Sequence, residues 1–97
     1  MKPYRKYRLI ELKKGSLLLT KEIDEEEDDT PVIVISYPLE NDDLIVESHL
    51  KVHYRSIEVR DKAFEEFGND EEHLKELVGY LKQEAKNLIK QLQDENN

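Results

Sequence analysis

The hydrophobic pattern of this chain changes its period near residue 55. Across residues 44–54 every second position is apolar or aromatic, apart from Ser48, and the positions between are mostly charged or histidine. This alternation is typical of a β-strand that turns one face to a core and the other to water. After residue 55 the apolar positions recur about every 3.6 residues, the period of an α-helix. We therefore expect strands in the first half and helices in the second.

Two of the expected strands form a hairpin. Residues 4–13 and 16–23 flank Lys14-Gly15, where glycine supplies the positive φ that a tight turn needs. A two-residue turn places apolar side chains of both strands on one face, as a half-buried hairpin requires. It also places Arg8 opposite Lys21, and this pair of like charges predicts that the hairpin splays or ends there.

A run of six carboxylates precedes the third expected strand. Residues 24–29 read Asp-Glu-Glu-Glu-Asp-Asp, and their mutual repulsion predicts a solvated loop. Residues 32–37 are apolar on both faces except at Ser36 and Tyr37, which indicates an interior strand, and residues 38–43 are expected to form the turn after it. Four strands joined by short connections most simply make an antiparallel meander.

Two helices are expected after the sheet. Ser56 suits the N-cap of the first, Gly68 suits the position just beyond its end, and Asp70 can cap a second helix that runs to about residue 93. The second helix carries an unbroken heptad seam of Leu74, Val78, Leu81, Ala85, Leu88 and Leu92. The predicted fold is one α+β domain over residues 1–97: a four-stranded, mainly antiparallel sheet (1–55), two helices (56–93) with the longer packed on the sheet, and a frayed tail (94–97).

Composition narrows the classes of protein to consider. A chain of 97 residues with 37% hydrophobic residues can build one modest core. It contains no cysteine, which excludes disulfides and thiolate chemistry and fits the cytoplasm. The longest apolar run, residues 32–35, is far shorter than the ~20 residues of a membrane span. Residues 1–12 hold no apolar signal-peptide core, so we expect a cytoplasmic protein that does not associate with membranes.

The charge is unevenly distributed. Residues 1–14 hold six basic side chains and one glutamate, whereas the remainder holds nine basic and 22 acidic side chains, and the whole chain has a net charge of −8. Basic residues among tyrosines can neutralise phosphates and stack on bases, so Lys2, Arg5, Lys6 and Arg8 are candidate nucleic-acid contacts. The overall negative charge opposes that encounter. The same segment can instead neutralise the acidic run within the molecule.

Residues that carry catalysis or hold metal ions are sparse. His49 and His53 share a strand face, but their Cα atoms are roughly 13 Å apart, too far to share one metal ion. Beyond His73, only Glu76 lies at helical spacing, and the acidic run lacks the ligand spacing and central glycine of an EF-hand. The chain has no glycine-rich phosphate loop and no His-Glu-x-x-His motif. We expect no catalytic activity, no metal site and no cofactor.

The heptad seam of the second helix allows two interpretations. The helix can pack on its own sheet, which is the simpler one, or it can pair with another helix. A helix of 23 residues is roughly 35 Å long and can overhang a small sheet, which would expose Leu88, Ile89 and Leu92 to a partner. We therefore expect a small acidic protein-interaction or regulatory module that forms homodimers through this end, and the alternative is a nucleic-acid-associated protein that uses the basic hairpin.

Overall fold

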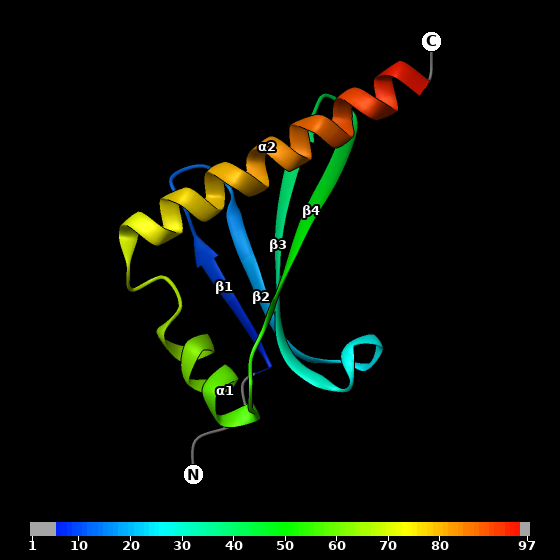
Figure 1. Ribbon diagram of the computed structural model, residues 1–97. Coiled ribbons are helices and arrows are strands. Elements are labelled where there is room, and N and C mark those ends of the chain that lie inside the picture. Colours follow the sequence, from blue (N-terminus) through cyan, green and yellow to red (C-terminus); the bar gives the residue numbers. More distant parts are fainter. Residues whose placement is uncertain (1–5, 96–97) are drawn as a thin grey trace.

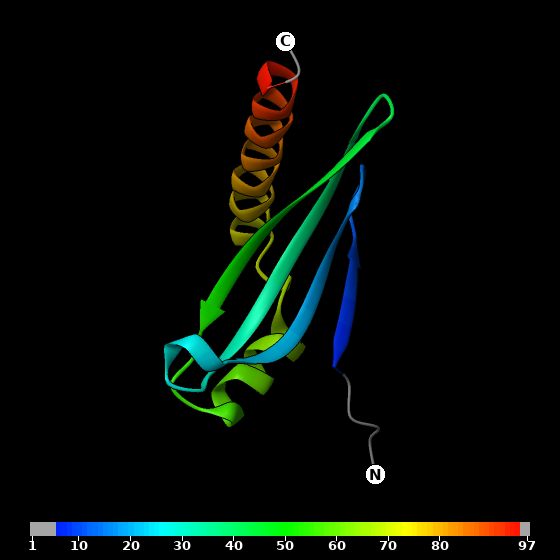
Figure 2. The same ribbon diagram turned by 90° about the vertical axis from the view of Figure 1, so that its right-hand side faces the viewer.

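The computed structural model describes residues 6–95 (Figure 1). Its elements are β1 (Tyr7–Glu11), β2 (Ser16–Asp24), the short 3-10 helix η1 (Glu25–Glu27), β3 (Thr30–Asn41), β4 (Leu44–His53), α1 (Ile57–Glu66) and α2 (Glu71–Glu95). The strands form one antiparallel sheet in the order β1-β2-β3-β4. Figure 2 shows both helices on the same face of this sheet. The predicted α+β meander followed by two helices is confirmed.

The core lies between one face of the sheet and the two helices. Leu19 of β2 pairs with Ile35 of β3, which pairs with Leu50 of β4, so their side chains form one apolar row across the sheet. Phe64 of α1 and Leu81 of α2 close over this face, and both are 0% exposed. The alternation that predicted β4 therefore places its apolar side chains in the core.

The third strand is twice as long as predicted. It continues through Pro38, and the turn that follows is Asp42-Asp43, so the predicted turn over residues 38–43 is wrong. The backbone bond from Tyr54 N to Pro31 O (2.9 Å) indicates that odd-numbered residues of β3 bond to β4. The N–H that Pro38 lacks would point toward β2, whose pairing with β3 ends at Ser36. A proline is therefore tolerated at this position.

The first hairpin pairs two residues away from the predicted register. Arg8 faces Leu19 rather than Lys21, so the predicted repulsion of like charges does not arise. The connection holds four residues instead of two, and within it Leu12 N–H donates to the Gly15 carbonyl at 3.1 Å. A shift of two residues keeps every side chain on its predicted face, because the faces of a strand alternate.

The helix boundaries follow the predicted caps. Ser56 Oγ accepts a hydrogen bond from Val59 N at 3.2 Å, and Asp70 Oδ1 accepts one from His73 N at 3.2 Å. Gly68, between the helices, has a φ of +93°, which a side chain would strain. The hydrogen bonds to Ser56 and Asp70 satisfy backbone N–H groups that the start of a helix leaves without an internal partner.

Helix α2 is attached to the sheet by apolar packing and by a polar contact at Ser48. Its buried side chains lie four residues apart and are Leu77, Leu81, Ala85 and Ile89. Ser48, the single polar residue in the β4 alternation, donates a hydrogen bond from Oγ to the Leu81 carbonyl at 2.8 Å. The predicted seam is confirmed at Leu81 and Ala85, but Ile89 rather than Leu88 continues the buried line.

Candidate interaction surfaces

The carboxyl end of α2 carries apolar side chains that the sheet does not cover. Leu88 and Leu92 are 38% and 40% exposed, whereas Ile89 is 6% exposed. Leu92 follows the buried Leu81 by about three helical turns and therefore lies on the same side of the helix. Its exposure arises because the last turns of α2 run clear of the β3–β4 hairpin (Figures 1 and 2). Two of the three predicted contact residues are accessible, and Ile89 is packed inward.

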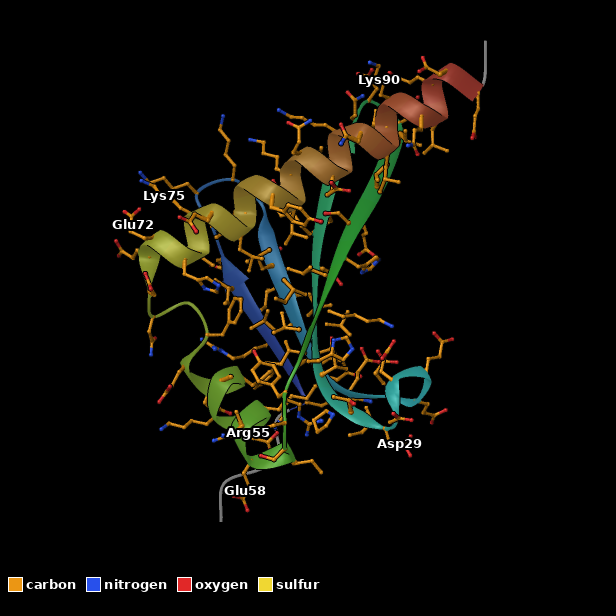
Figure 3. The ribbon with its side chains drawn as sticks, in the orientation of Figure 1. Asp29, Arg55, Glu58, Glu72, Lys75 and Lys90 are labelled. Carbon is orange, nitrogen blue, oxygen red and sulfur yellow. The ribbon has the colours of Figure 1, made fainter. Side chains whose placement is uncertain are left out.

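This end of α2 differs in charge from the rest of the molecule. Residues 82–95 contain three lysines and three carboxylates, so their net charge is zero in a chain of net charge −8. Figure 3 shows Lys90 on the side of α2 that faces away from the sheet. Two copies of this segment can therefore approach each other without local charge repulsion.

The predicted nucleic-acid contacts are placed differently from one another. Lys2 and Arg5 lie outside the described residues. Lys6 is exposed, with its Nζ 5.9 Å from the centroid of the Tyr7 ring. Arg8 lies on the core face, where Nη1 donates to the Phe64 carbonyl at 2.6 Å at the end of α1. The charge of Arg8 thus complements the negative end of the helix dipole. A guanidinium group held in this contact is less available to bind a nucleic acid.

The acidic run, residues 24–29, does not form a uniformly solvated loop as predicted. Asp24 ends β2 and is 8% exposed, and its Oδ2 accepts a hydrogen bond from His53 Nε2 at 2.8 Å. This hydrogen bond is the main reason that the pKa of Asp24 is lowered; burial opposes the shift and the charge of Lys51, 3.9 Å away, adds to it. Residues 25–27 form η1, and Asp28 and Asp29 adopt left-handed φ values of 52° and 55°.

The pH dependence of stability reports on the Asp24–His53 contact. Because the folded-state pKa of Asp24 is below its unfolded value, the stabilisation is present above about pH 4 and is lost as the pH falls through the folded-state pKa. Asp24→Asn is expected to lower the free energy of unfolding near neutral pH and to flatten its decline in acid. Urea unfolding at a series of pH values measures both. The control is Glu25→Gln, which is expected to decline in acid as wild type does. If the free energy of unfolding of Asp24→Asn declined in acid as steeply as that of wild type or of this control, the assignment would be contradicted.

A second histidine contact lies on the open face of the sheet. Ser36 Oγ is 2.9 Å from His49 Nδ1, and His49 Nε2 is 3.8 Å from Glu47 Oε2. Carboxylate, imidazole and hydroxyl are the groups of a hydrolytic triad. Ser36 is only 8% exposed, however, which leaves little room for a substrate carbonyl beside its hydroxyl. We infer that this contact is structural and gives the buried Ser36 hydroxyl a hydrogen-bond partner.

A buried charge cluster beside α1 was not predicted. Arg60 is 4% exposed and donates from Nε and Nη2 to Asp61 Oδ1 at 3.1 and 3.0 Å, and from Nη1 to the Glu22 carbonyl at 2.8 Å. Lys21, 6% exposed, places its Nζ 3.6 Å from the same Asp61 oxygen and 5.0 Å from the centroid of the Phe64 ring. This cluster ties α1 to β2.

An apolar cavity of about 300 Å³ opens where α1 and α2 meet the sheet. Its apolar lining includes Leu50 and Val52 of β4 and Phe67 after α1. Polar groups also line it, namely Tyr54, Glu66, Asp70 and His73. The His73 ring meets the Phe67 ring edge-on, with the centroids 5.9 Å apart. Burial raises the pKa of the Tyr54 hydroxyl, as expected for a phenol next to apolar side chains.

Comparisons with known proteins give no relative. No family model, no curated protein and no solved structure matches this chain. Within residues 6–95, no helix is long and apolar enough to cross a membrane. In the same range, no three histidine, aspartate or glutamate side chains are grouped so that they could hold a metal ion. The function must therefore be argued from the surfaces described above.

Proposed function

We propose that this protein is a small, acidic, cytoplasmic interaction module without catalytic activity, and that it forms homodimers through the carboxyl end of α2. The observation that carries the proposal is the exposure of Leu88 and Leu92 on the side of the helix that packs on the sheet elsewhere. Full burial of an exposed leucine side chain is favourable by roughly 1.5–3 kcal/mol, and Leu88 and Leu92 are already more than half buried, so each contributes roughly 0.6–1.2 kcal/mol at an interface. A second copy presents the same two side chains, as a twofold interface requires.

The expected dimer is weak and depends on concentration. The overhanging end spans few turns, so the buried area falls toward the small, transient class of interfaces, below about 1,200 Å². The zero net charge of residues 82–95 removes the main electrostatic obstacle to pairing. An apolar contact of this kind is expected to persist at high salt, because screening acts on charges and not on buried apolar surface.

Aspartate substitutions test this contact. Leu88→Asp combined with Leu92→Asp is expected to weaken dimerisation by at least about 100-fold, because charged groups would be buried without partners. A matched control is Gln83→Asp combined with Asn87→Asp, which adds the same charge at the same spacing on an exposed part of the helix. Sedimentation velocity, with far-UV circular dichroism to confirm folding, measures the outcome. A dimer that survives Leu88→Asp and Leu92→Asp, or that the control dissociates equally, would contradict the proposed interface.

The nucleic-acid alternative makes a different prediction in the same experiment. A protein that binds phosphates gains mass with a mixed oligonucleotide at low salt and loses it steeply as salt rises. The hydrogen bond between Arg8 and the end of α1 leaves fewer basic groups for that role. Binding of the oligonucleotide by a monomer would therefore replace the dimer proposal with the alternative.

A further inference from the structure

The cavity between the helices and the sheet combines an apolar floor with polar side chains at its edge. Among residues 6–95, the exposed side chains of Glu66 and His73 and the half-buried Tyr54 hydroxyl make no hydrogen bond or ion pair to another described residue, so they are free to contact a ligand. Asp70 accepts hydrogen bonds through Oδ1 from the backbone of α2. A concave, mostly apolar site with a few polar groups at its edge is typical of a binding site for a small molecule.

The charge at the cavity favours one sign of ligand. Its lining contains the carboxylates of Glu66 and Asp70 and neither lysine nor arginine. The rings of Tyr54 and Phe67 also line it, and aromatic faces attract cations. The volume of about 300 Å³ is at the lower end of the range for ligand pockets, roughly 300–1,000 Å³. Both features favour a small cationic ligand over a large or anionic one.

We infer that this cavity binds a small organic amine, with its apolar body against Leu50, Val52 and Phe67 and its ammonium group at Glu66 and Asp70. The Tyr54 hydroxyl and the His73 ring provide further polar contacts beside the ammonium. The inference does not depend on dimerisation, because the cavity lies where α1 meets α2 and the proposed interface is at the opposite end of α2 (Figure 1).

Three probes separate this proposal from general attraction of cations to an acidic protein. 2-Phenylethylammonium has both the charge and the apolar body, 3-phenylpropionate has the body with the opposite charge, and ethanolammonium has the charge without the body. NMR titration of the labelled full chain is expected to show binding of 2-phenylethylammonium at millimolar concentration or below, with shifts at the amides of Leu50, Val52 and Gly68. The other two probes are expected to bind at least about tenfold more weakly.

Two variants locate the site. Glu66→Gln is expected to weaken binding of 2-phenylethylammonium by about tenfold, because a charge-assisted hydrogen bond is lost. The control, Glu65→Gln, changes the preceding exposed carboxylate, which does not line the cavity, and is expected to leave binding unchanged. Equal or tighter binding of 3-phenylpropionate, no binding of the amine, or equal effects of the two variants would each overturn the proposal.

Discussion

Phe64→Ala is expected to lower the free energy of unfolding by about 3–5 kcal/mol, the largest effect of any single substitution considered. Phe64 is 0% exposed at the centre of the contact between α1 and the sheet. Truncation leaves a cavity and removes the ring that the Lys21 ammonium approaches at 5.0 Å. A domain of this size has roughly 5–15 kcal/mol of stability in total, so the variant is expected to be marginally folded.

Equilibrium urea unfolding measures this loss, and an aromatic residue on the other helix supplies the control. Tyr80 of α2 is 53% exposed, so Tyr80→Ala is expected to cost less than about 1 kcal/mol. A loss at Phe64 no larger than the loss at Tyr80 would show that α1 does not pack on the sheet as described.

Arg60→Ala is expected to lower the free energy of unfolding by about 2–4 kcal/mol, the second largest effect. Arg60 is 4% exposed, and its side chain binds both the Asp61 carboxylate and the Glu22 carbonyl, so its removal leaves these acceptors without that donor. Asp61 retains the ion pair with Lys21 at 3.6 Å and is 37% exposed at its side chain, which limits the loss. The packing of the arginine stem against α1 and β2 is lost as well.

Two further variants separate the charge of Arg60 from its packing. Arg60→Met retains most of the apolar stem and is expected to lose less stability than Arg60→Ala, by about 1 kcal/mol. Lys62→Ala removes an exposed basic side chain from the same helix and is expected to change stability by less than about 0.5 kcal/mol. If Arg60→Ala were no more destabilising than Lys62→Ala in urea unfolding, the buried cluster would contribute nothing to the fold.

The order and type of the elements could be predicted because the hydrophobic period is a local property. The alternation over residues 44–54 and the helical caps at Ser56 and Asp70 each depend on residues close in the chain, and the structure confirms them. The length of the third strand could not be predicted in this way. Pro38 indicates a turn in local terms, and it is tolerated only because the pairing of β2 ends at Ser36.

The burial of Lys21 and Arg60 could not be predicted from the sequence, because their positions in the pattern and their charges indicate opposite locations. Lys21 continues the alternation of Leu17 and Leu19 and therefore lies on the core face, and Arg60 precedes Phe64 by one helical turn. Their positions in the pattern predict burial, whereas their charge predicts exposure. Asp61 reduces the conflict, since its single carboxylate forms an ion pair with each of the two side chains. Such a partner is visible only when β2 and α1 are placed side by side.

The exposed end of α2 shows how far periodicity alone can identify a surface. The heptad spacing correctly placed Leu92 on the same side as Leu81, but only the length of the sheet decides which of these is covered. Ile89 was expected to be exposed with them and is buried, because the buried line of the helix advances in steps of four residues. Side-chain accessibility at a helix end is therefore a property of the tertiary fold.

The molar mass in solution tests the proposed interaction surface most directly. Light scattering over a dilution series, at low and at high salt, is expected to give a mass that approaches twice the chain mass of 11.5 kDa as concentration rises, with little effect of salt. A contact worth about −4 kcal/mol is half occupied near 1 mM, so a series that reaches this concentration detects even a weak dimer. A mass of one chain throughout the series would contradict self-association through α2.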